Sequence, residues 1–222
     1  METLRIDAGA VLAQTFALLR RAPVLTLLAL AVLAGLDTLS DVVGTTSSGG
    51  VTIVVSLLSL GFQLMITRQL LDALNLRGPG TGSNFWAILA LGFISGLAIL
   101  LGLALLVVSG IILIVRWALA VPILIAEEVS PSDAMRRSWT LTQGNFGPVL
   151  ATLVVIYAPG LALLVAAVML LPPEWSEWLP ALAVANIVME AIFIVGWHLQ
   201  VALFSASHGG DAGERAMSDI FA

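Results

Sequence analysis

Long runs of apolar residues, separated by short polar stretches, form the dominant pattern along this chain of 222 residues. Each of six runs approaches the length of about 17 to 25 residues that a helix needs to cross a bilayer. The pattern therefore predicts an all-α fold, a polytopic membrane bundle of six transmembrane helices within a single integral membrane domain, 1–222. The predicted spans are residues 23–43, 51–76, 84–108, 110–126, 148–171 and 179–205.

Three shorter segments lie outside these runs. Residues 2–21 place apolar side chains at helical spacing, which predicts an amphipathic helix lying either in the headgroup plane of the membrane or under the bundle. Between the fourth and fifth spans, Ser130 precedes Pro131 and Asp133 in a capping pattern, so a short cytoplasmic helix is predicted over 131–143. Residues 206–222 are polar and are predicted to form a short tail.

The composition supports a membrane protein and narrows its chemistry. Only 10% of the residues are charged, against about 25% in a soluble domain. The absence of cysteine excludes disulfides and thiolate metal sites, and the net charge of −5 argues against nucleic acid as a partner. The chain has no glycine-rich phosphate loop, zinc pattern or nucleophile elbow, and its two histidines lack a carboxylate cluster. We therefore expect no enzyme activity, no cofactor and no metal.

The distribution of arginine predicts the orientation of the chain. Six spans place both termini on one side, and the arginines gather on that side, whereas the opposite side holds acidic residues only. The positive-inside rule then puts both termini in the cytoplasm. The arginines concerned are Arg5, Arg20, Arg21, Arg77, Arg136, Arg137 and Arg215, and the acidic residues are Asp37, Asp41, Glu174 and Glu177.

Two charged residues, Arg116 and Glu190, fall inside predicted spans. An arginine costs about 2.5 to 3.5 kcal/mol in such a position, so something inside the bundle is expected to receive it. Counting along the helices puts Arg116 about 16 Å from the inner interface and Glu190 about 18 Å from the outer one. These depths nearly coincide in a core of about 30 Å. We predict an ion pair between the two, which either fixes helix packing or carries a proton or solute.

Further polar residues line two of the spans. Gln63 belongs to a polar stripe along the second span, and Asn186 and His198 share one helical stripe with Glu190 in the sixth. Hydrogen bonding between helices is the simpler interpretation of these stripes, and a substrate path is the alternative. Pro122 is predicted to kink the fourth span.

The short helix over 131–143 carries a pair of arginines. Arg136 and Arg137 can reach either lipid phosphates or the carboxylates Glu127 and Glu128 just upstream. Both arginines are therefore candidates for contact with lipid headgroups.

A series of residues between Gly110 and Asn145 resembles a known family signature. It resembles the membrane domain associated with glycerophosphoryl diester phosphodiesterases and the stand-alone bacterial relatives of that domain. One departure is Ser109, where many relatives have proline. The residues that carry the resemblance are Gly110-Ile111-Ile112, Arg116-Trp117, Pro122, Glu127, Glu128, Ala134, Arg137-Ser138-Trp139, Leu141-Thr142 and Gly144-Asn145.

The resemblance implies a six-span protein of the bacterial inner membrane with a short cytoplasmic helix after the fourth span. It implies no catalytic residue, because hydrolysis in the fused members resembles the work of a separate soluble barrel, and nothing in this chain corresponds to that barrel.

These observations lead to two functional hypotheses. The first is a non-enzymatic inner-membrane protein that supports envelope or lipid-related processes by binding membrane lipids, a protein partner or a second copy of itself. The alternative is a small transporter or permease component that uses the polar site around Arg116 and Glu190. An intramembrane enzyme has less support, because the sequence pairs no nucleophile with a base.

Overall fold

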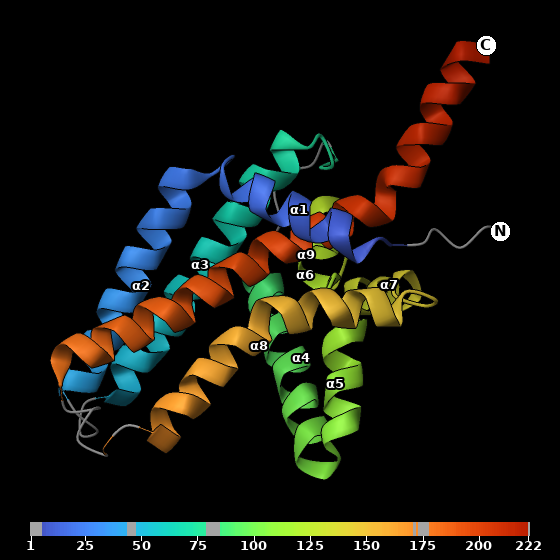
Figure 1. Ribbon diagram of the computed structural model, residues 1–222. Coiled ribbons are helices and arrows are strands. Elements are labelled where there is room, and N and C mark those ends of the chain that lie inside the picture. Colours follow the sequence, from blue (N-terminus) through green and yellow to red (C-terminus); the bar gives the residue numbers. More distant parts are fainter. Residues whose placement is uncertain (1–5, 44–47, 79–84, 171, 173–177, 222) are drawn as a thin grey trace.

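The computed structural model describes residues 6–43, 48–78, 85–170, 172 and 178–221, and the side chains of all of these except 48, 49 and 209–221. The described residues form helices joined by turns (Figure 1). Arg5, Glu174 and Glu177 lie outside the described residues, as do residues 2–4 of the predicted amphipathic segment and the side chain of Arg215. The helices are α1 (Ala8–Leu19), α2 (Pro23–Val43), α3 (Ser48–Ala73), α4 (Phe85–Leu105), α5 (Val107–Arg116), α6 (Ala120–Glu127), α7 (Pro131–Leu141), α8 (Phe146–Leu170) and α9 (Leu179–Phe221).

Six helical segments in the described part of the chain are long and apolar enough to cross a membrane. They are α2, α3, α4, α8, α9 and the segment Val107–Glu127, which comprises α5 and α6. Many of their largest apolar side chains point outward, and Val24 and Phe93, for example, are 78% and 73% exposed. Such a surface is costly in water and is typical of contact with lipid. The prediction of an all-α polytopic bundle is confirmed.

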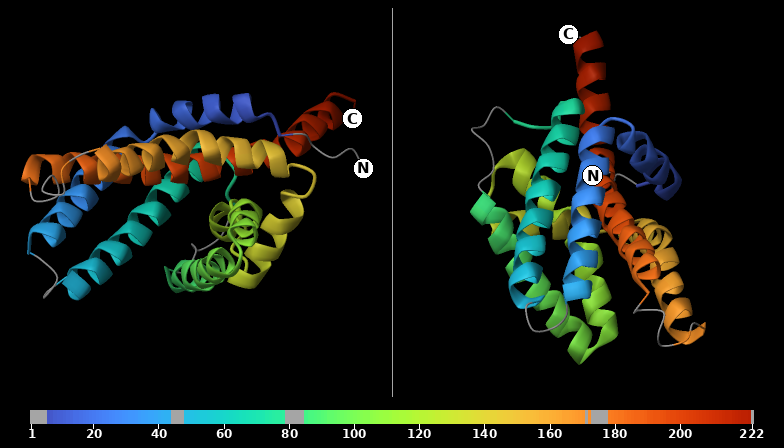
Figure 2. Two further views of the ribbon diagram at one scale, coloured as in Figure 1. Left: turned by 60° about the horizontal axis from the view of Figure 1, so that its bottom comes forward. Right: turned by 90° about the vertical axis from the view of Figure 1, so that its left-hand side faces the viewer.

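Helix α9 is the central element of the bundle. It packs against α1, α2, α3 and α8, and Figure 2 shows it running along the molecule beside α8 and α2. Its side chains Leu199, Leu203 and Phe204 are fully buried. The second half of the membrane-spanning part of α9 therefore belongs to the hydrophobic core.

Two glycines allow α8 and α9 to approach each other closely. A Cβ atom at Gly160 on α8 would overlap the side chain of Ile192 on α9. A Cβ atom at Gly196 on α9 would in turn overlap the hydroxyl of Tyr157 on α8. Each helix thus receives a large side chain of its neighbour at a glycine, the small-residue packing that is common between helices in membranes.

Helix α1 lies against the bundle. Asp7 caps its N-terminus by accepting hydrogen bonds from the backbone N–H groups of Gly9 and Ala10, at 2.8 and 3.2 Å. Its buried face, which includes Val11 and Leu18, packs on α9 and α8. The helix therefore packs on the transmembrane helices, and its position relative to the lipid headgroups stays a prediction.

The turn between α4 and α5 differs from the expected position. The sequence suggested a division at Ser109, but the extended residue is Leu106, with φ −152° and ψ 116°. Ser109 lies in the first turn of α5, and its hydroxyl donates to the carbonyl oxygen of Gly102 at 2.8 Å. Because that hydroxyl satisfies a carbonyl group at the end of α4, the hairpin can turn within a single residue.

The predicted fourth span is broken into α5 and α6 at residues 117–119. Pro122 explains the break, because proline has no N–H to donate to the carbonyl group four residues earlier, and its ring clashes with that group. The carbonyl group concerned belongs to Ala118, which lies within the break. The predicted kink is thus present, and it falls one turn before the proline itself.

Helix α7 begins as the capping pattern predicted. The Ser130 hydroxyl accepts from the backbone N–H of Asp133 at 3.2 Å and donates to the carboxylate of Asp133 at 2.7 Å. Gly144, shortly after the helix ends, has a positive φ of 80° that suits glycine. The predicted tail begins at residue 206, and α9 continues through it as helix to Phe221.

Candidate functional site

The polar stripe of α9 meets a matching set of polar residues on α2. The Asn186 side-chain amide donates to Asp41 Oδ2 at 2.9 Å and to Thr38 Oγ1 at 3.2 Å. A little over three helical turns further along α9, the buried His198 lies with its Nε2 atom 3.3 Å from Thr26 Oγ1. The two ends of the stripe therefore serve as cross-links between the first and the last transmembrane helix.

Glu190 lies between these two cross-links, and its carboxyl group is close enough to that of Asp37 on α2 for the two to interact. Carboxylates have only acceptor atoms, so a hydrogen bond between two of them requires a proton held by one partner. The second oxygen of Glu190, Oε2, is buried and has no hydrogen-bond partner. The pair is therefore a place where the bundle can bind a proton.

Asp37 and Glu190 border a cavity of about 520 Å³. Polar side chains from α3 line another part of its wall, and Leu60, Phe93 and Trp197 contribute apolar surface. The cavity thus contains two carboxyl groups and several hydroxyl groups, and it lies among the membrane-spanning helices α2, α3, α4 and α9. The hydroxyl groups belong to Thr52, Ser56 and Ser59, members of the polar stripe predicted along the second span.

The predicted ion pair between Arg116 and Glu190 is wrong. Glu190 contacts Asp37, whereas the guanidinium carbon of Arg116 lies 5.3 Å from the ring centroid of Trp139 and 5.7 Å from that of Phe146. Arg116 is the last residue of α5, which packs on α4, α7 and α8. The depth count failed because it assumed an unbroken fourth span, and the break carries Arg116 toward α7 instead of α9.

The backbone at Arg116 is anchored by Ser138 of α7. The buried Ser138 hydroxyl donates to the carbonyl oxygen of Arg116 at 2.7 Å and accepts from the N–H of Leu119 at 3.2 Å. One side chain therefore satisfies a backbone group on each side of the break. Two side chains of the family-like series, Ser138 and Trp139, thus hold the backbone and the guanidinium of a third residue, Arg116.

Other polar side chains also find partners on α9. Gln63 of α3 donates through Nε2 to Gln200 Oε1 at 3.4 Å, a long hydrogen bond. Gln14 of α1 donates to the Ser205 hydroxyl at 3.0 Å. These contacts support the simpler interpretation of the stripe containing Gln63, which is hydrogen bonding between helices.

The two arginines of α7 both have carboxylate partners. Arg136 forms an ion pair with Asp133 at 2.8 Å, and Arg137 forms one with Glu127 of α6. Their side chains nevertheless remain 79% and 53% exposed. His208 of α9 also approaches, with Nε2 4.0 Å from Glu127.

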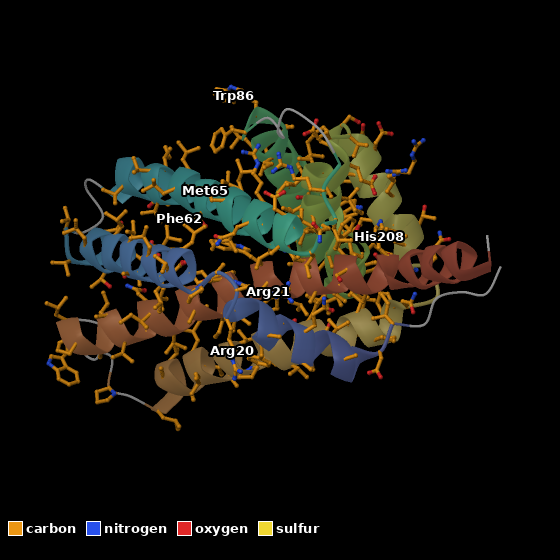
Figure 3. All side chains as sticks on the ribbon, turned by 90° about the horizontal axis from the view of Figure 1, so that it is seen from above. Arg20, Arg21, Phe62, Met65, Trp86 and His208 are labelled. Atoms are coloured by element: carbon orange, nitrogen blue, oxygen red, sulfur yellow. The ribbon has the colours of Figure 1, made fainter. Side chains whose placement is uncertain are left out.

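These groups form a polar pocket of about 340 Å³ bordered by α6, α7 and α9. Figure 3 shows His208 on α9 where that helix passes the bundle end, and Arg20 and Arg21 where α1 meets α2. The lining residues of the pocket are Glu127, Arg136, Arg137, Thr140, Leu141 and His208.

Sequence reasoning missed Asp37 as a partner of Glu190 and the two rings beside Arg116. Asp37 and Asp41 were counted only as charges on the outer side. Asp37 and Asp41 are four residues apart, as are Asn186 and Glu190, so each pair lies on one face of its helix. This equal spacing could have indicated that the two pairs face each other. Arg116 lies beside Trp139 and Phe146 because the fourth span breaks directly after it. Pro122 predicts a kink in this span but not the direction in which Arg116 then points. No group of three or more candidate metal ligands occurs among the described residues.

The fold defines a class, the polytopic α-helical membrane proteins. Within that class the chain matches the family described as the membrane domain of glycerophosphoryl diester phosphodiesterase over residues 91–204, just over half of its length. The chain belongs to this family, as the signature between Gly110 and Asn145 indicated. Searches of curated proteins and of solved structures each found no match. The matched region runs from α4 into α9, so it includes Arg116, Trp139 and Glu190 but leaves out Asp37.

Proposed function

We propose that this chain is a non-enzymatic protein of the bacterial inner membrane that binds anionic lipid headgroups at α7, with both termini in the cytoplasm. The observation that carries the proposal is the pocket of about 340 Å³ that contains Arg136, Arg137 and His208. Its size and its basic side chains suit a phosphate-containing headgroup, and arginine recognises phosphate through paired N–H donors.

The shape of α7 supports the same function. Ala134, Ser138 and Thr142 are fully buried against the bundle, while Arg136 and Arg137 are exposed. A helix with one face on the protein and a basic face outward is suited to the anionic surface of the cytoplasmic leaflet. The ion pairs with Asp133 and Glu127 hold the arginine side chains in place and also compete with the lipid for them.

The test compares two pairs of arginines on the predicted cytoplasmic side. The Arg136→Ala/Arg137→Ala protein is expected to lose phosphatidylglycerol that the wild type retains in native mass spectrometry. The Arg20→Ala/Arg21→Ala protein has the same change in charge and is the matched control. Equal lipid retention by both variants and the wild type would reject α7 as the headgroup site.

The cavity beside Asp37 and Glu190 favours a second candidate function, the binding and passage of protons or small cationic solutes. It is supported by a membrane cavity that reaches Glu190 and contains a second carboxyl group and several hydroxyl groups. Proteoliposomes with an internal pH-sensitive dye are expected to acidify under an imposed gradient, and Glu190→Gln is expected to abolish the flux. Asp41→Asn removes a nearby carboxylate that does not line the cavity, so it serves as the control. Identical flux in empty liposomes would reject this function.

A further inference from the structure

Among the arginines in the described part of the chain, Arg116 has the most buried side-chain nitrogen atoms without a hydrogen-bond partner. Its Nε and Nη1 atoms are buried and have no hydrogen-bond partner. Among the described residues, Arg116 takes part in no ion pair with a carboxylate. A guanidinium has N–H donors all around its edge, and donors left without acceptors in a poorly hydrated place are unfavourable. The missing group is therefore an acceptor, preferably an anion.

Two aromatic rings lie beside the guanidinium, while two of its nitrogen atoms have no hydrogen-bond partner. Trp139 and Phe146 lie 5.3 and 5.7 Å from its central carbon, within the range of cation–π attraction. Such contacts hold the group in place without using its N–H donors. Arg116 is only half-buried, so part of its side chain reaches the surface of the protein.

The position of Arg116 is built into the fold. The hydrogen bond from Ser138 to its carbonyl group fixes the end of α5 against α7, and Pro122 keeps the helix broken there. The guanidinium therefore occupies this place because of backbone constraints that do not involve its own charge. This arrangement is expected of a preformed site, since the cation would otherwise turn toward a carboxylate of the protein.

The surroundings of Arg116 connect a lipid-facing surface with a polar one. Ile111 and Ile114 of α5 are each 37% exposed and lie just before it, and Trp139 is 36% exposed. Helix α7, which contacts α5, carries the exposed arginines Arg136 and Arg137. Tryptophan is enriched at the level of the headgroups, which is where an apolar helix surface meets a basic one. The acceptor available at that level is the phosphate group of a phospholipid.

We propose that Arg116, held between Trp139 and Phe146 at the break between α5 and α6, binds the phosphate group of one phospholipid molecule whose acyl chains lie along α5. This inference rests on the proposed function and gives it a second, structurally separate site. The α7 pocket depends on net negative charge of the lipid. The Arg116 site recognises the phosphate itself, so it accepts phosphatidylcholine as well as phosphatidylglycerol.

The experiment uses the full chain, purified in detergent and depleted of lipid, with binding measured by native mass spectrometry. Dioleoyl phosphatidylcholine is the probe, dioleoylglycerol is the control without phosphate, and inorganic phosphate is the control without acyl chains. The wild type is expected to bind one phosphatidylcholine molecule and neither control. Arg116→Lys keeps the charge but loses the paired donors, and it is expected to bind at least tenfold more weakly. Arg20→Lys, an exposed arginine, is expected to bind as the wild type does.

Three outcomes would overturn the inference. Unchanged phosphatidylcholine binding by a folded Arg116→Lys protein would show that this guanidinium is not the site. Equal binding of dioleoylglycerol would remove the role of phosphate. Binding of inorganic phosphate as tight as that of phosphatidylcholine would mean that the site binds a free anion and not a phospholipid. Loss of phosphatidylglycerol in Arg136→Ala/Arg137→Ala with phosphatidylcholine retained would separate the α7 pocket from this site.

A measurement on the wild type covers the case in which Arg116→Lys fails to fold. Phenylglyoxal modifies accessible guanidinium groups, and peptide mass spectrometry reports the modified arginine. Phosphatidylcholine is expected to slow the modification of Arg116 at least fivefold and to leave that of Arg20 unchanged. Equal modification of Arg116 with and without phosphatidylcholine would reject the site without any substitution.

Discussion

The hydroxyl of Ser138 is hydrogen-bonded to the carbonyl oxygen of Arg116 at 2.7 Å, across 22 residues of chain and from one helix to another. The hydroxyl oxygen of Ser138 also accepts from the N–H of Leu119. Ser138 thereby replaces the backbone partners that the broken helix lacks, and it joins α7 to the junction of α5 and α6.

Removal of that hydroxyl is expected to destabilise the protein. Ser138→Ala leaves a buried N–H and a buried carbonyl group without partners, which costs about 1 to 3 kcal/mol. The thermal unfolding midpoint in detergent is expected to fall accordingly. Ser132→Ala, in an exposed position at the start of the same helix, is the control and is expected to change stability by less than about 0.5 kcal/mol. Equal midpoints for the two variants would contradict the bridging role.

The corrected partner of Glu190 can be checked by double-mutant cycles. The stability effects of Arg116→Ala and Glu190→Ala are expected to add to within about 0.5 kcal/mol, because the two side chains do not interact. Those of Asp37→Ala and Glu190→Ala are expected to differ from additivity by about 0.5 to 3 kcal/mol. Unfolding of the three single and two double variants in detergent measures both cycles. A large coupling energy between Arg116→Ala and Glu190→Ala would indicate that these two side chains form an ion pair after all.

The close packing of α8 on α9 predicts a sensitive glycine. Gly196→Ala places a methyl group on the Tyr157 hydroxyl and is expected to cost about 1 to 3 kcal/mol. Because the clashing atom is that hydroxyl, Tyr157→Phe combined with Gly196→Ala is expected to recover part of the loss. A Cβ atom at Gly147 would meet nothing within 4 Å, so Gly147→Ala is the control. A Gly196→Ala protein as stable as the wild type would contradict this packing.

The ion pair between Glu127 and Arg137 predicts the effect of neutralising the acid. Glu127→Gln frees Arg137 for a lipid phosphate, so the affinity for phosphatidylglycerol is expected to rise severalfold, and more so at low salt. Native mass spectrometry over a lipid titration measures the change. Asp72→Asn neutralises the partner of Arg77, 3.1 Å away in another ion pair, and leaves the α7 pocket untouched. An equal rise for both variants would mean that overall charge, and not the pocket, sets the affinity.

The predicted orientation is open to labelling because the chain contains no cysteine. In right-side-out membrane vesicles, a membrane-impermeant maleimide is expected to label Gly50→Cys and to spare Ser132→Cys. Permeabilised vesicles serve as the control, and both positions are expected to react there. The reverse pattern would place α7 on the outer side and remove the basis for contact with the cytoplasmic leaflet.

The sequence predicted the number and type of the helices well, because a membrane-spanning helix depends on a local run of apolar residues. It also located the cap at Ser130 and the kink at Pro122, which depend on neighbours a few residues away. The partners of Arg116 and Glu190 depended instead on how helices rotate and where a span breaks. The fourth span breaks directly after Arg116, whose guanidinium lies beside Trp139 of α7, and a depth count along one helix does not include such a break.

The polar contacts of α9 have a consequence for biogenesis. Asn186, His198, Gln200 and Ser205 supply hydrogen-bond partners to α1, α2 and α3 over separations of 137 to 191 residues. At a translation rate of about 5 to 20 residues per second, the earlier helices wait roughly 7 to 40 seconds for these partners. During that interval Asp37 and Gln63 have no α9 beside them, so the nascent chain depends on lipid, water or the insertion machinery to accommodate its polar groups. Assembly of the first half of the molecule is therefore completed only when its last helix arrives.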